Sequence, residues 1–270
     1  MPHAVRSLLF VPGNRPERID KALGSGADRV IIDLEDAVAP QAKDEARAAV
    51  AHWLATSDSG HVVLRINSAE TAWFEKDLAL CSHARVAGVM VPKAEEVECL
   101  AAVRRAGARS LWPLIESAAG FGALGALAGA EAVERLAFGS IDFQLDMCMR
   151  DAHEEELLYF RSQLVLASRL ARVAPPIDGV STAIDDAILL QQDAQRARRL
   201  GFAGKLCIHP RQVPVVNASF DPSPEELAWA QRVLEAARHA GGAAVAVDGK
   251  MVDKPVILKA QGIVGEAGER

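Results

Sequence analysis

The chain has 270 residues, of which 50% are hydrophobic and 24% are charged. This balance is typical of a globular protein and excludes a disordered or collagen-like chain. The length fits one or two domains, including a single α/β barrel. Lys and Arg number 30 and Asp and Glu number 36, so the formal net charge is −6. An acidic chain is a poor candidate for binding nucleic acid or an anionic membrane, and an anionic ligand would need a local cluster of positive charge.

The cysteines and the apolar segments predict a cytoplasmic, soluble protein. The four cysteines, Cys81, Cys99, Cys148 and Cys207, are too far apart in the sequence for a CxxC or zinc-ribbon pattern. We therefore expect them to be reduced and mostly structural. The opening apolar run is too short for a signal peptide, and no segment approaches the roughly 18 uncharged apolar residues of a membrane helix.

Short apolar segments rich in Val, Ile and Leu recur along the chain and predict about eight strands. Their nearly continuous apolar character is typical of strands buried on both faces of a parallel sheet. The segments are RSLLFVPG from Arg6, RVIIDLED from Arg29, HVVLRIN from His61, VAGVMVPK from Val86, SLWPLIES from Ser110, RLAFGSID from Arg135, PPIDGVST from Pro175 and GKLCIHP from Gly204.

The segments between these runs have the period of amphipathic helices. One helix is predicted by the apolar spacing of Ala46, Ala49, Val50, Trp53 and Leu54, and another by that of Leu157, Leu164, Ala167, Leu170 and Ala171. A third is expected to begin after Ser223, with Pro224 in its first turn and Glu226 three residues after the cap, and to end near His239 before Gly241–Gly242.

Alternating strands and helices over about 240 residues predict a (β/α)₈ TIM barrel. An open doubly wound sheet is the alternative, but no GxGxxG follows the first strand, which disfavours its dinucleotide-binding form. We expect residues 1–242 to form the barrel domain. Residues 243–270, with the polar segment DGKMVDKP and a helix from about Val256, are expected to form a C-terminal arm or lid.

Ionisable residues follow nearly every predicted strand at the same end. Catalytic groups of such barrels lie at the carboxyl ends of the strands, and a barrel built only for stability has no reason to gather charges on one rim. The residues are Arg15, Asp33, Glu35, Asp36, Arg65, Asn67, Lys93, Glu116, Asp142 and His209.

Two of these carboxylates, Glu116 and Asp142, are expected to come from adjacent strands and to approach a common point. Two carboxylates with water suit a hard divalent ion, most simply Mg²⁺, and no histidine cluster favours zinc. The alternative is that Glu116 forms a structural ion pair with an arginine. Asp146, four residues beyond Asp142, is expected in the following loop or at a helix start, which it would cap.

Two arginines are candidates for binding an anionic substrate. Arg65 is flanked by apolar residues, and a buried arginine suits forked recognition of a carboxylate or stabilisation of an enolate oxygen. A salt bridge from Arg65 to Glu35 or Asp36 is the structural alternative, and both can hold together. Arg15 could hold a phosphate or carboxylate near the first helix, or it could be a solvated surface residue.

Eight motifs in order resemble the HpcH/HpaI aldolase and citrate lyase β-subunit family. They cover nearly the whole chain, and the most similar branch is that of the citrate lyase β-like proteins and the malyl-CoA or citramalyl-CoA lyases. The motifs are LLFVPGNRPERIDKA, IIDLEDAV, VVLRIN, GVMVPKAE, PLIESAAG, FGSIDFQLDM, KLCIHPRQV and DGKMVDKPV. The segment CMRDAHEEE departs from the Leu-Gly that many members have there, so the specificity loop is expected to differ.

The resemblance implies a TIM barrel in a homotrimer or hexamer with a Mg²⁺-dependent site. It implies that Glu116 and Asp142 bind the metal, that Asp146 does not, and that Glu116 and Arg65 contact the substrate. It further implies that Arg15 faces substrate or coenzyme A. Asp253 of the late GKMVDKP motif would reach a neighbouring subunit's site as a catalytic residue, and this arm favours the coenzyme A branch.

The expected reaction is cleavage of a 3-hydroxy-carboxyacyl-CoA, such as citryl-, malyl- or citramalyl-CoA, to acetyl-CoA and an oxo acid. One alternative is a metal-dependent class II aldolase acting on free hydroxy-oxo acids. Another is a non-catalytic citrate lyase β-like component of a larger complex. Fold alone does not decide among these.

Overall fold

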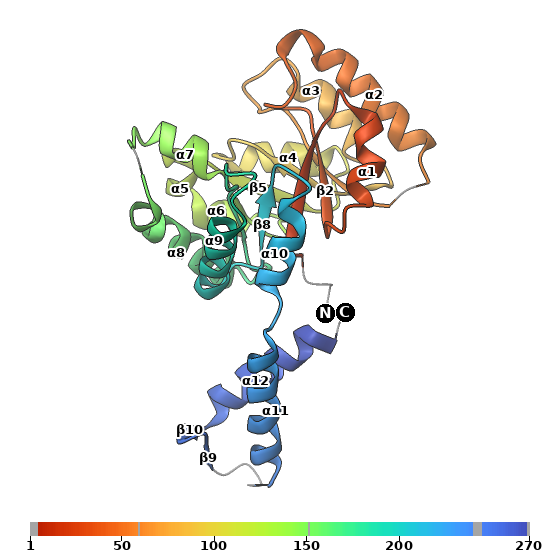
Figure 1. Ribbon diagram of the computed structural model, residues 1–270. Helices are drawn as coiled ribbons and strands as arrows, with labels where there is room; N and C mark the ends of the chain where they lie inside the picture. Colours follow the sequence, from red (N-terminus) through yellow and green to blue (C-terminus); the bar gives the residue numbers. More distant parts are fainter. Residues whose placement is uncertain (1–4, 59, 151, 240–244, 269–270) are drawn as a thin grey trace. The chain divides into compact units, whose positions relative to one another are not determined.

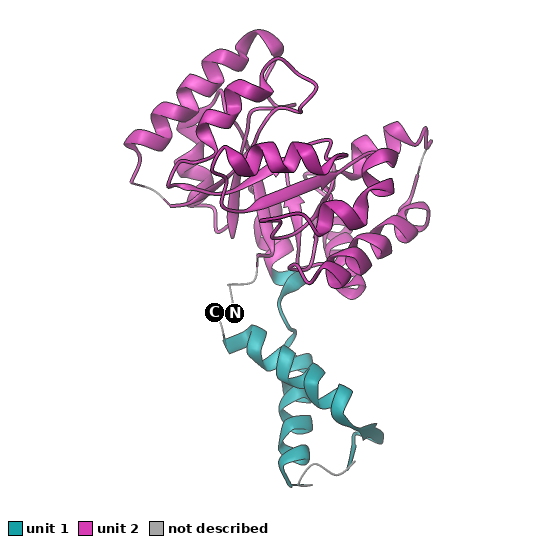
Figure 2. Ribbon diagram, turned by 180° about the vertical axis from the view of Figure 1, so that it is seen from behind, with its two compact units in different colours: residues 1–4, 218–270 teal, residues 5–217 magenta. Residues whose placement is uncertain are grey.

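The computed structural model describes residues 5–58, 60–150, 152–239 and 245–268. The chain separates into two compact units, one over residues 5–217 and a smaller one that includes residues 218–268 (Figure 2). The expected boundary after residue 242 stays a prediction about domains, and by contacts the separation lies earlier, at Asn217. The Gly241–Gly242 helix stop lies outside the described residues. Within the described ranges, no helix combines the length and the apolar character needed to span a membrane.

Eight parallel strands close into a barrel in the larger unit (Figure 1). Each strand pairs with its neighbours in the chain, and β8 pairs with β1 to complete the circle. Every segment predicted as a strand contributes one, so the predicted TIM barrel is confirmed. The strands are β1 (Ser7–Pro12), β2 (Arg29–Asp33), β3 (Val62–Arg65), β4 (Val86–Val91), β5 (Leu111–Ile115), β6 (Ala137–Phe138), β7 (Ile177–Asp178) and β8 (Gly204–Cys207).

The barrel interior is filled with apolar side chains contributed by all eight strands. Because side chains alternate along a strand, one set points inward and the next points toward the surrounding helices. Both sets are buried, which explains the continuous apolar runs in the sequence. The inward cluster comprises Val5, Leu8, Ile31, Val63, Met90, Trp112, Leu114, Ala137, Ile177 and Leu206.

Helices and short 3₁₀ turns follow the strands. The predicted helices around Val50 and Leu164 are confirmed as α2 and α8, but Leu170, expected on the buried face of α8, is 74% exposed. The helices are α1 (Ile19–Leu23), α2 (Lys43–Thr56), α3 (Phe74–Asp77), α4 (Val97–Arg105), α5 (Ala118–Gly122), α6 (Leu124–Ala128), α7 (Ser140–Asp146), α8 (Glu154–Ala171), α9 (Ala187–Leu200) and α10 (Gln212–Phe220), with 3₁₀ turns η1 (Pro16–Arg18), η2 (Pro40–Ala42) and η3 (Leu78–Leu80).

The smaller unit is a helical pair with a hairpin between its members. It contains α11 (Pro224–His239), β9 (Val245–Val247), β10 (Lys250–Val252) and α12 (Lys254–Gly268). The predicted helix start is confirmed, because Ser223 and Glu226 form a reciprocal capping box at α11. The predicted last helix begins two residues earlier than Val256. Its own apolar core, centred on Val233, Val252 and Ala260, holds the unit together.

Candidate functional site

A cavity of about 390 Å³ lies at the carboxyl ends of the barrel strands. Its floor is the top of the barrel core, and its walls come from every strand except β4 or from the segment that follows that strand. The lining residues are Phe10, Pro12, Asp33, Asp36, Ala37, Arg65, Leu114, Glu116, Phe138, Gly139, Ser140, Ile141, Asp142, Val180, Leu206 and Ile208. Arg65, Glu116 and Asp142, all expected at the site from sequence, are therefore brought together.

Arg65 is fixed in the cavity wall by Asp33. The two residues are register partners on β3 and β2, and Nε and Nη2 of Arg65 donate to Oδ1 and Oδ2 of Asp33 at 2.8 and 2.6 Å. The guanidinium also stacks on Phe10 at 4.8 Å from the ring centroid. Burial opposes the charged form, but the surrounding carboxylates outweigh it, and the pKa of Arg65 is raised. Arg65 thus stays cationic while it faces the cavity.

The turn after β2 surrounds the same guanidinium with two further carboxylates. Glu35 and Asp36 lie 3.0 and 3.6 Å from Nη1 of Arg65, so the ion pairs proposed as the structural alternative are present beside the cavity-lining role. Burial raises the pKa of Glu35 to about 8 despite Arg65, and the nearby negative charges add to this rise. Buried Lys43 holds the turn by donating to the carbonyls of Leu34 and Glu35.

Glu116 follows β5 directly and is 5% exposed. Its Oε1 accepts a hydrogen bond of 2.7 Å from the backbone N–H of Lys93, whose positive φ of 45° aims that amide at the carboxylate. Burial raises the pKa of Glu116 to about 7, the Lys93 amide lowers it, and the charge of Asp142 raises it further. A buried carboxylate facing a second carboxylate is a group that a cation would stabilise.

Asp142 lies in the first turn of α7, and the expectation that it ends the sixth strand is wrong. The strand β6 stops at Phe138, and Gly139 turns the chain into the helix. Asp142 is exposed but lines the cavity with Glu116. Its helix is tied back to the Glu116 corner, because Oδ2 of Asp146 accepts a 2.7 Å hydrogen bond from the N–H of Ala118. Asp146 was expected in a loop or at a helix start, but it is the last residue of α7, and the helix it caps is α5.

Gly139 allows the close approach of α7 to Glu116. A Cβ atom at this position would overlap both the Cβ and the Oε2 atoms of Glu116. The backbone N–H of Gly139 also donates to the carbonyl of Ile115 at 2.9 Å, which fixes the spacing between the two elements. The motif FGSID therefore contributes to the site in two ways. Gly139 has no side chain and so lets α7 approach Glu116, and Asp142 supplies the second carboxylate.

The donor set fits Mg²⁺. Two carboxylates face one cavity, one of them buried, and their oxygens are the ligands this ion prefers. Among the described residues, no group of three or more His, Cys, Asp or Glu side chains is arranged for a metal. The arrangement therefore suits an ion that completes its coordination with water and substrate.

Two residues expected at the site lie elsewhere in the structure. The side chain of Arg15 is half exposed, pairs with Glu17 at 2.7 Å and does not line the cavity. Asp253 belongs to the smaller unit, where its carboxylate accepts from the N–H of Val256 at the start of α12. Their functional roles stay predictions.

The other rim residues hold loops. Asn67 donates to buried Asp77, and the ring nitrogen of His209 accepts from the N–H of Arg211.

Three features of the site were not predicted from the sequence. They are the two hydrogen bonds from Arg65 to Asp33, the hydrogen bond from the backbone N–H of Lys93, and the absence of a side chain at Gly139. Asp33 had a usable signal, because it and Arg65 both end neighbouring strands, where opposite charges pair. The other two act through backbone geometry.

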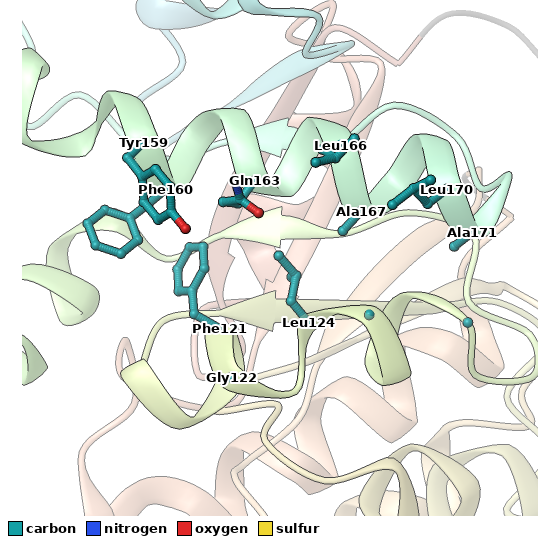
Figure 3. Close-up of a pocket in the computed structure, with 12 residues that line it drawn as sticks. Phe121, Gly122, Leu124, Tyr159, Phe160, Gln163, Leu166, Ala167, Leu170 and Ala171 are labelled. Carbon is teal, nitrogen blue, oxygen red and sulfur yellow. The ribbon is translucent and has the colours of Figure 1, made fainter.

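A larger hollow of about 620 Å³ lies on the outside of the barrel between α6 and α8 (Figure 3). Its walls are apolar, with Phe121 and Leu124 facing Phe160 and Leu166 in the close-up. No charged side chain is among its described lining residues. The smaller cavity is therefore the candidate functional site, because it carries the carboxylates and Arg65.

Comparison with known protein families gives matches over nearly the whole chain. A sequence model for HpcH/HpaI aldolase/citrate lyase matches residues 6–210, and one for a C–C bond lyase of the TIM-barrel fold matches residues 156–267. A citrate lyase subunit beta-like protein of Deinococcus radiodurans is 38% identical over 276 residues, covering 96% of each chain. A (3S)-malyl-CoA thioesterase of Cereibacter sphaeroides is 34% identical over 274 residues, covering 98% of this chain and 95% of the relative.

Among solved structures, the protein CitE from Mycobacterium tuberculosis superimposes with a TM-score of 0.86 at 35% identity, covering 98% of both chains. That structure is a complex with magnesium, acetoacetate and coenzyme A.

Proposed function

The chain belongs to the HpcH/HpaI aldolase/citrate lyase family of carbon–carbon lyases, and we propose that it is a Mg²⁺-dependent lyase acting on a 3-hydroxy-carboxyacyl-CoA. Citryl-, malyl- and citramalyl-CoA are the candidate substrates, and the products are acetyl-CoA and an oxo acid. The observation that carries the proposal is the convergence of Glu116, Asp142 and Arg65 on one cavity. The magnesium, oxo acid and coenzyme A bound by the CitE relative support it.

Glu116 and Asp142 are the residues that would hold Mg²⁺. When bound, the ion would chelate the hydroxyl and carboxylate of the substrate and lower the pKa of that hydroxyl. The Oε2 side of Glu116, turned toward Gly139, and the exposed carboxylate of Asp142 would supply oxygen ligands from two different elements. The Lys93 amide keeps the Glu116 carboxylate in one orientation.

Arg65 would stabilise the charge that appears when the carbon–carbon bond breaks. The hydroxyl proton passes to water, the hydroxyl oxygen becomes the oxo group, and the electron pair of the broken carbon–carbon bond passes to the α-carbon of the thioester to form an enolate. A guanidinium that Asp33 and Glu35 have already oriented needs no reorganisation to face that enolate oxygen. Protonation of the α-carbon then gives acetyl-CoA.

Asp253 of a second copy is the proposed donor of that proton. It lies between β10 and α12 in the smaller unit, at the end of a polar hairpin segment suited to an arm that closes over a neighbouring site. This part of the proposal requires a homo-oligomer, either a trimer or a hexamer. Arg15 is proposed to contact coenzyme A from the barrel rim, where its side chain is accessible.

Thioester hydrolysis is a second candidate activity, because one relative of 34% identity is a (3S)-malyl-CoA thioesterase. Hydrolysis would give the free hydroxy acid and coenzyme A in place of acetyl-CoA and an oxo acid. The same cavity and metal would serve, with water attacking the thioester carbonyl. The two activities differ in their products, so one assay separates them.

The test is product analysis with malyl-, citramalyl- and citryl-CoA in Mg²⁺ and in EDTA. We expect acetyl-CoA and oxo acid to form only with Mg²⁺, and the activity to disappear in Glu116→Ala and Asp142→Ala. Activity that survives both substitutions would refute the metal site. Free coenzyme A with malate would identify a thioesterase, and condensation of pyruvate with an aldehyde would identify a free-acid aldolase. An isolated chain that binds Mg²⁺ but is inert on every thioester would indicate a non-catalytic component.

The proposed location is the cytoplasm. All four cysteines are free, with Cys81 and Cys207 buried, as expected in a reducing compartment. Alkylation of the native protein should therefore label exposed Cys148 first. A disulfide-linked native protein would contradict this location.

A further inference from the structure

The charges in the cavity wall are confined to one arc. Going around the barrel, Asp33 and Asp36 come from β2 and the turn after it, Arg65 from β3, Glu116 from the end of β5 and Asp142 from α7. The arc from β7 through β8 to β1 carries none of the charged lining residues. The cavity therefore has a polar side and an apolar side.

The apolar side is formed by Val180, Leu206, Ile208 and Phe10. Leu206 is 3% exposed and belongs to the barrel core, against which Val180 and Phe10 pack. Ile208 stands higher, with 41% of its surface exposed. We call these four residues the apolar arc; its base at Leu206 is buried, and its upper edge at Ile208 is exposed.

The reacting carbon of each candidate substrate carries four groups. On the proposed lyase function, on which this inference rests, the hydroxyl and carboxylate are held at Glu116 and Asp142. The thioester arm places its developing enolate oxygen at Arg65. These three groups occupy the polar side, so the fourth is left for the apolar arc. That fourth group is hydrogen in malyl-CoA, methyl in citramalyl-CoA and a carboxymethyl group in citryl-CoA.

We propose that the apolar arc selects a substrate whose fourth group is uncharged, so that the protein cleaves citramalyl- or malyl-CoA in preference to citryl-CoA. Arg65 is the one cation among the described residues that line the cavity, and it is already paired with Asp33 and Glu35. A carboxymethyl group would bring a charge against Val180 and Leu206, and none of the described residues on that side of the cavity is a cation that could pair with it. Desolvating a carboxylate without a partner is costly, whereas a methyl group gains from burial.

The first test compares kcat/KM of the Mg²⁺-loaded full-length protein for the three thioesters. The better of citramalyl- and malyl-CoA should exceed citryl-CoA by at least about tenfold, because an unpaired charge in a specificity pocket is rejected strongly. Equal rates or a preference for citryl-CoA would overturn the inference and leave the lyase proposal intact. Cleavage of none of the three would instead remove the lyase proposal, and the binding measurement below would still test the arc.

A substitution at Ile208, on the exposed edge of the apolar arc, tests whether the absence of a positive charge causes the discrimination against citryl-CoA. Ile208 is held through its backbone N–H, which donates to Gln212 at 2.8 Å, so its half-exposed side chain can change without loss of that bond. Ile208→Arg should shift the ratio of kcat/KM toward citryl-CoA by about tenfold, because it supplies the missing cation. Ile208→Leu should keep the ratio of the unmodified protein. A shift of equal size in both variants would contradict the role of charge.

Binding of two small acids separates recognition from catalysis. Oxaloacetate and 4-methyl-2-oxovalerate share the oxo acid head, and an isopropyl group in the second replaces the distal carboxylate of the first. Calorimetry with the Mg²⁺-loaded protein should show tighter binding of 4-methyl-2-oxovalerate than of freshly prepared oxaloacetate. The opposite order would overturn the inference without reference to any turnover.

Discussion

Arg65 and Asp33 end neighbouring strands and are joined by two parallel hydrogen bonds of 2.8 and 2.6 Å. The fork fixes the plane of the guanidinium, and stacking on Phe10 supports its face. Asp33 also accepts from the N–H groups of Glu35 and Ala37, so one carboxylate organises both the arginine and the turn beside it. Arg65 is thus oriented before any substrate arrives.

Replacing Arg65 with Lys should separate charge from orientation. The lysine keeps the positive charge but cannot form the fork to Asp33. We expect turnover to fall by about 10²- to 10³-fold, the range seen when one preorganised donor to a developing oxyanion is removed. Steady-state kinetics with the preferred thioester measure this loss.

Arg6→Lys is the matched control for that loss. Arg6 forms the same two-bond fork to Asp28, but it precedes β1 at the opposite end of the barrel. Both substitutions should lower the free energy of unfolding by about 1–3 kcal/mol, because each removes charged hydrogen bonds. Only Arg65→Lys should lose turnover. Equal losses of turnover in the two variants would show that stability explains the effect.

Gly139→Ala should weaken Mg²⁺ binding. The added methyl group overlaps Glu116, so the carboxylate must move or α7 must retreat with Asp142. Gly125→Ala is the control, because nothing lies within 4 Å of its Cβ position. In this helix alanine should be neutral or stabilising by up to about 1 kcal/mol. Calorimetric titration of Mg²⁺ compares the two, and unchanged affinity in Gly139→Ala would mean that the close approach does not matter.

Asp146 should act on the metal site through the position of α7. Its bond to the N–H of Ala118 ties the helix carrying Asp142 to the corner carrying Glu116. Asp146→Ala should weaken Mg²⁺ binding about tenfold, and Asp146→Asn, which keeps an acceptor oxygen, should restore most of it, as for conserved supports of metal ligands. Asp20→Ala removes a similar bond, that to Trp53, and should leave Mg²⁺ affinity unchanged. A loss that Asn fails to rescue would argue against the tether.

Mg²⁺ affinity should rise with pH and level off above about pH 7. The pKa of Glu116 is raised to about 7 by burial and by Asp142, and the metal binds its deprotonated form. Between about pH 5 and 7 the folded, metal-free protein holds a proton that the unfolded chain has released. The free energy of unfolding in EDTA should therefore fall as the pH rises through this window. Titrations from pH 5.5 to 8 test both effects, and affinity independent of pH would contradict the raised pKa.

Much of the barrel could be predicted because its strands are buried on both faces. Continuous apolar runs, such as those around Ile31 and Val63, mark strands whatever the order of their pairing. The capping box of Ser223 and Glu226 likewise marks a helix start by local chemistry alone. Because parallel strands all end on the same side of the barrel, the charged residues that follow them could also be predicted to gather there.

The sequence pattern could not place Asp142 correctly, because a continuous apolar segment does not show at which residue the buried strand ends. The strand β6 has two residues, and the turn at Gly139 brings the chain into α7 sooner than expected. The Lys93 amide was missed for a related reason. Its role depends on a left-handed backbone conformation, which lysine rarely adopts and which no residue pattern in the segment signals.

The central claim is that Glu116 and Asp142 hold one Mg²⁺ ion, and calorimetric titration of the metal-free, full-length protein tests it most directly. The account predicts one site per chain in the unmodified protein, lost in both Glu116→Gln and Asp142→Asn. It also predicts that the site is retained in Asp44→Asn, which changes an exposed carboxylate on α2. Full Mg²⁺ affinity in either Glu116→Gln or Asp142→Asn would contradict the account.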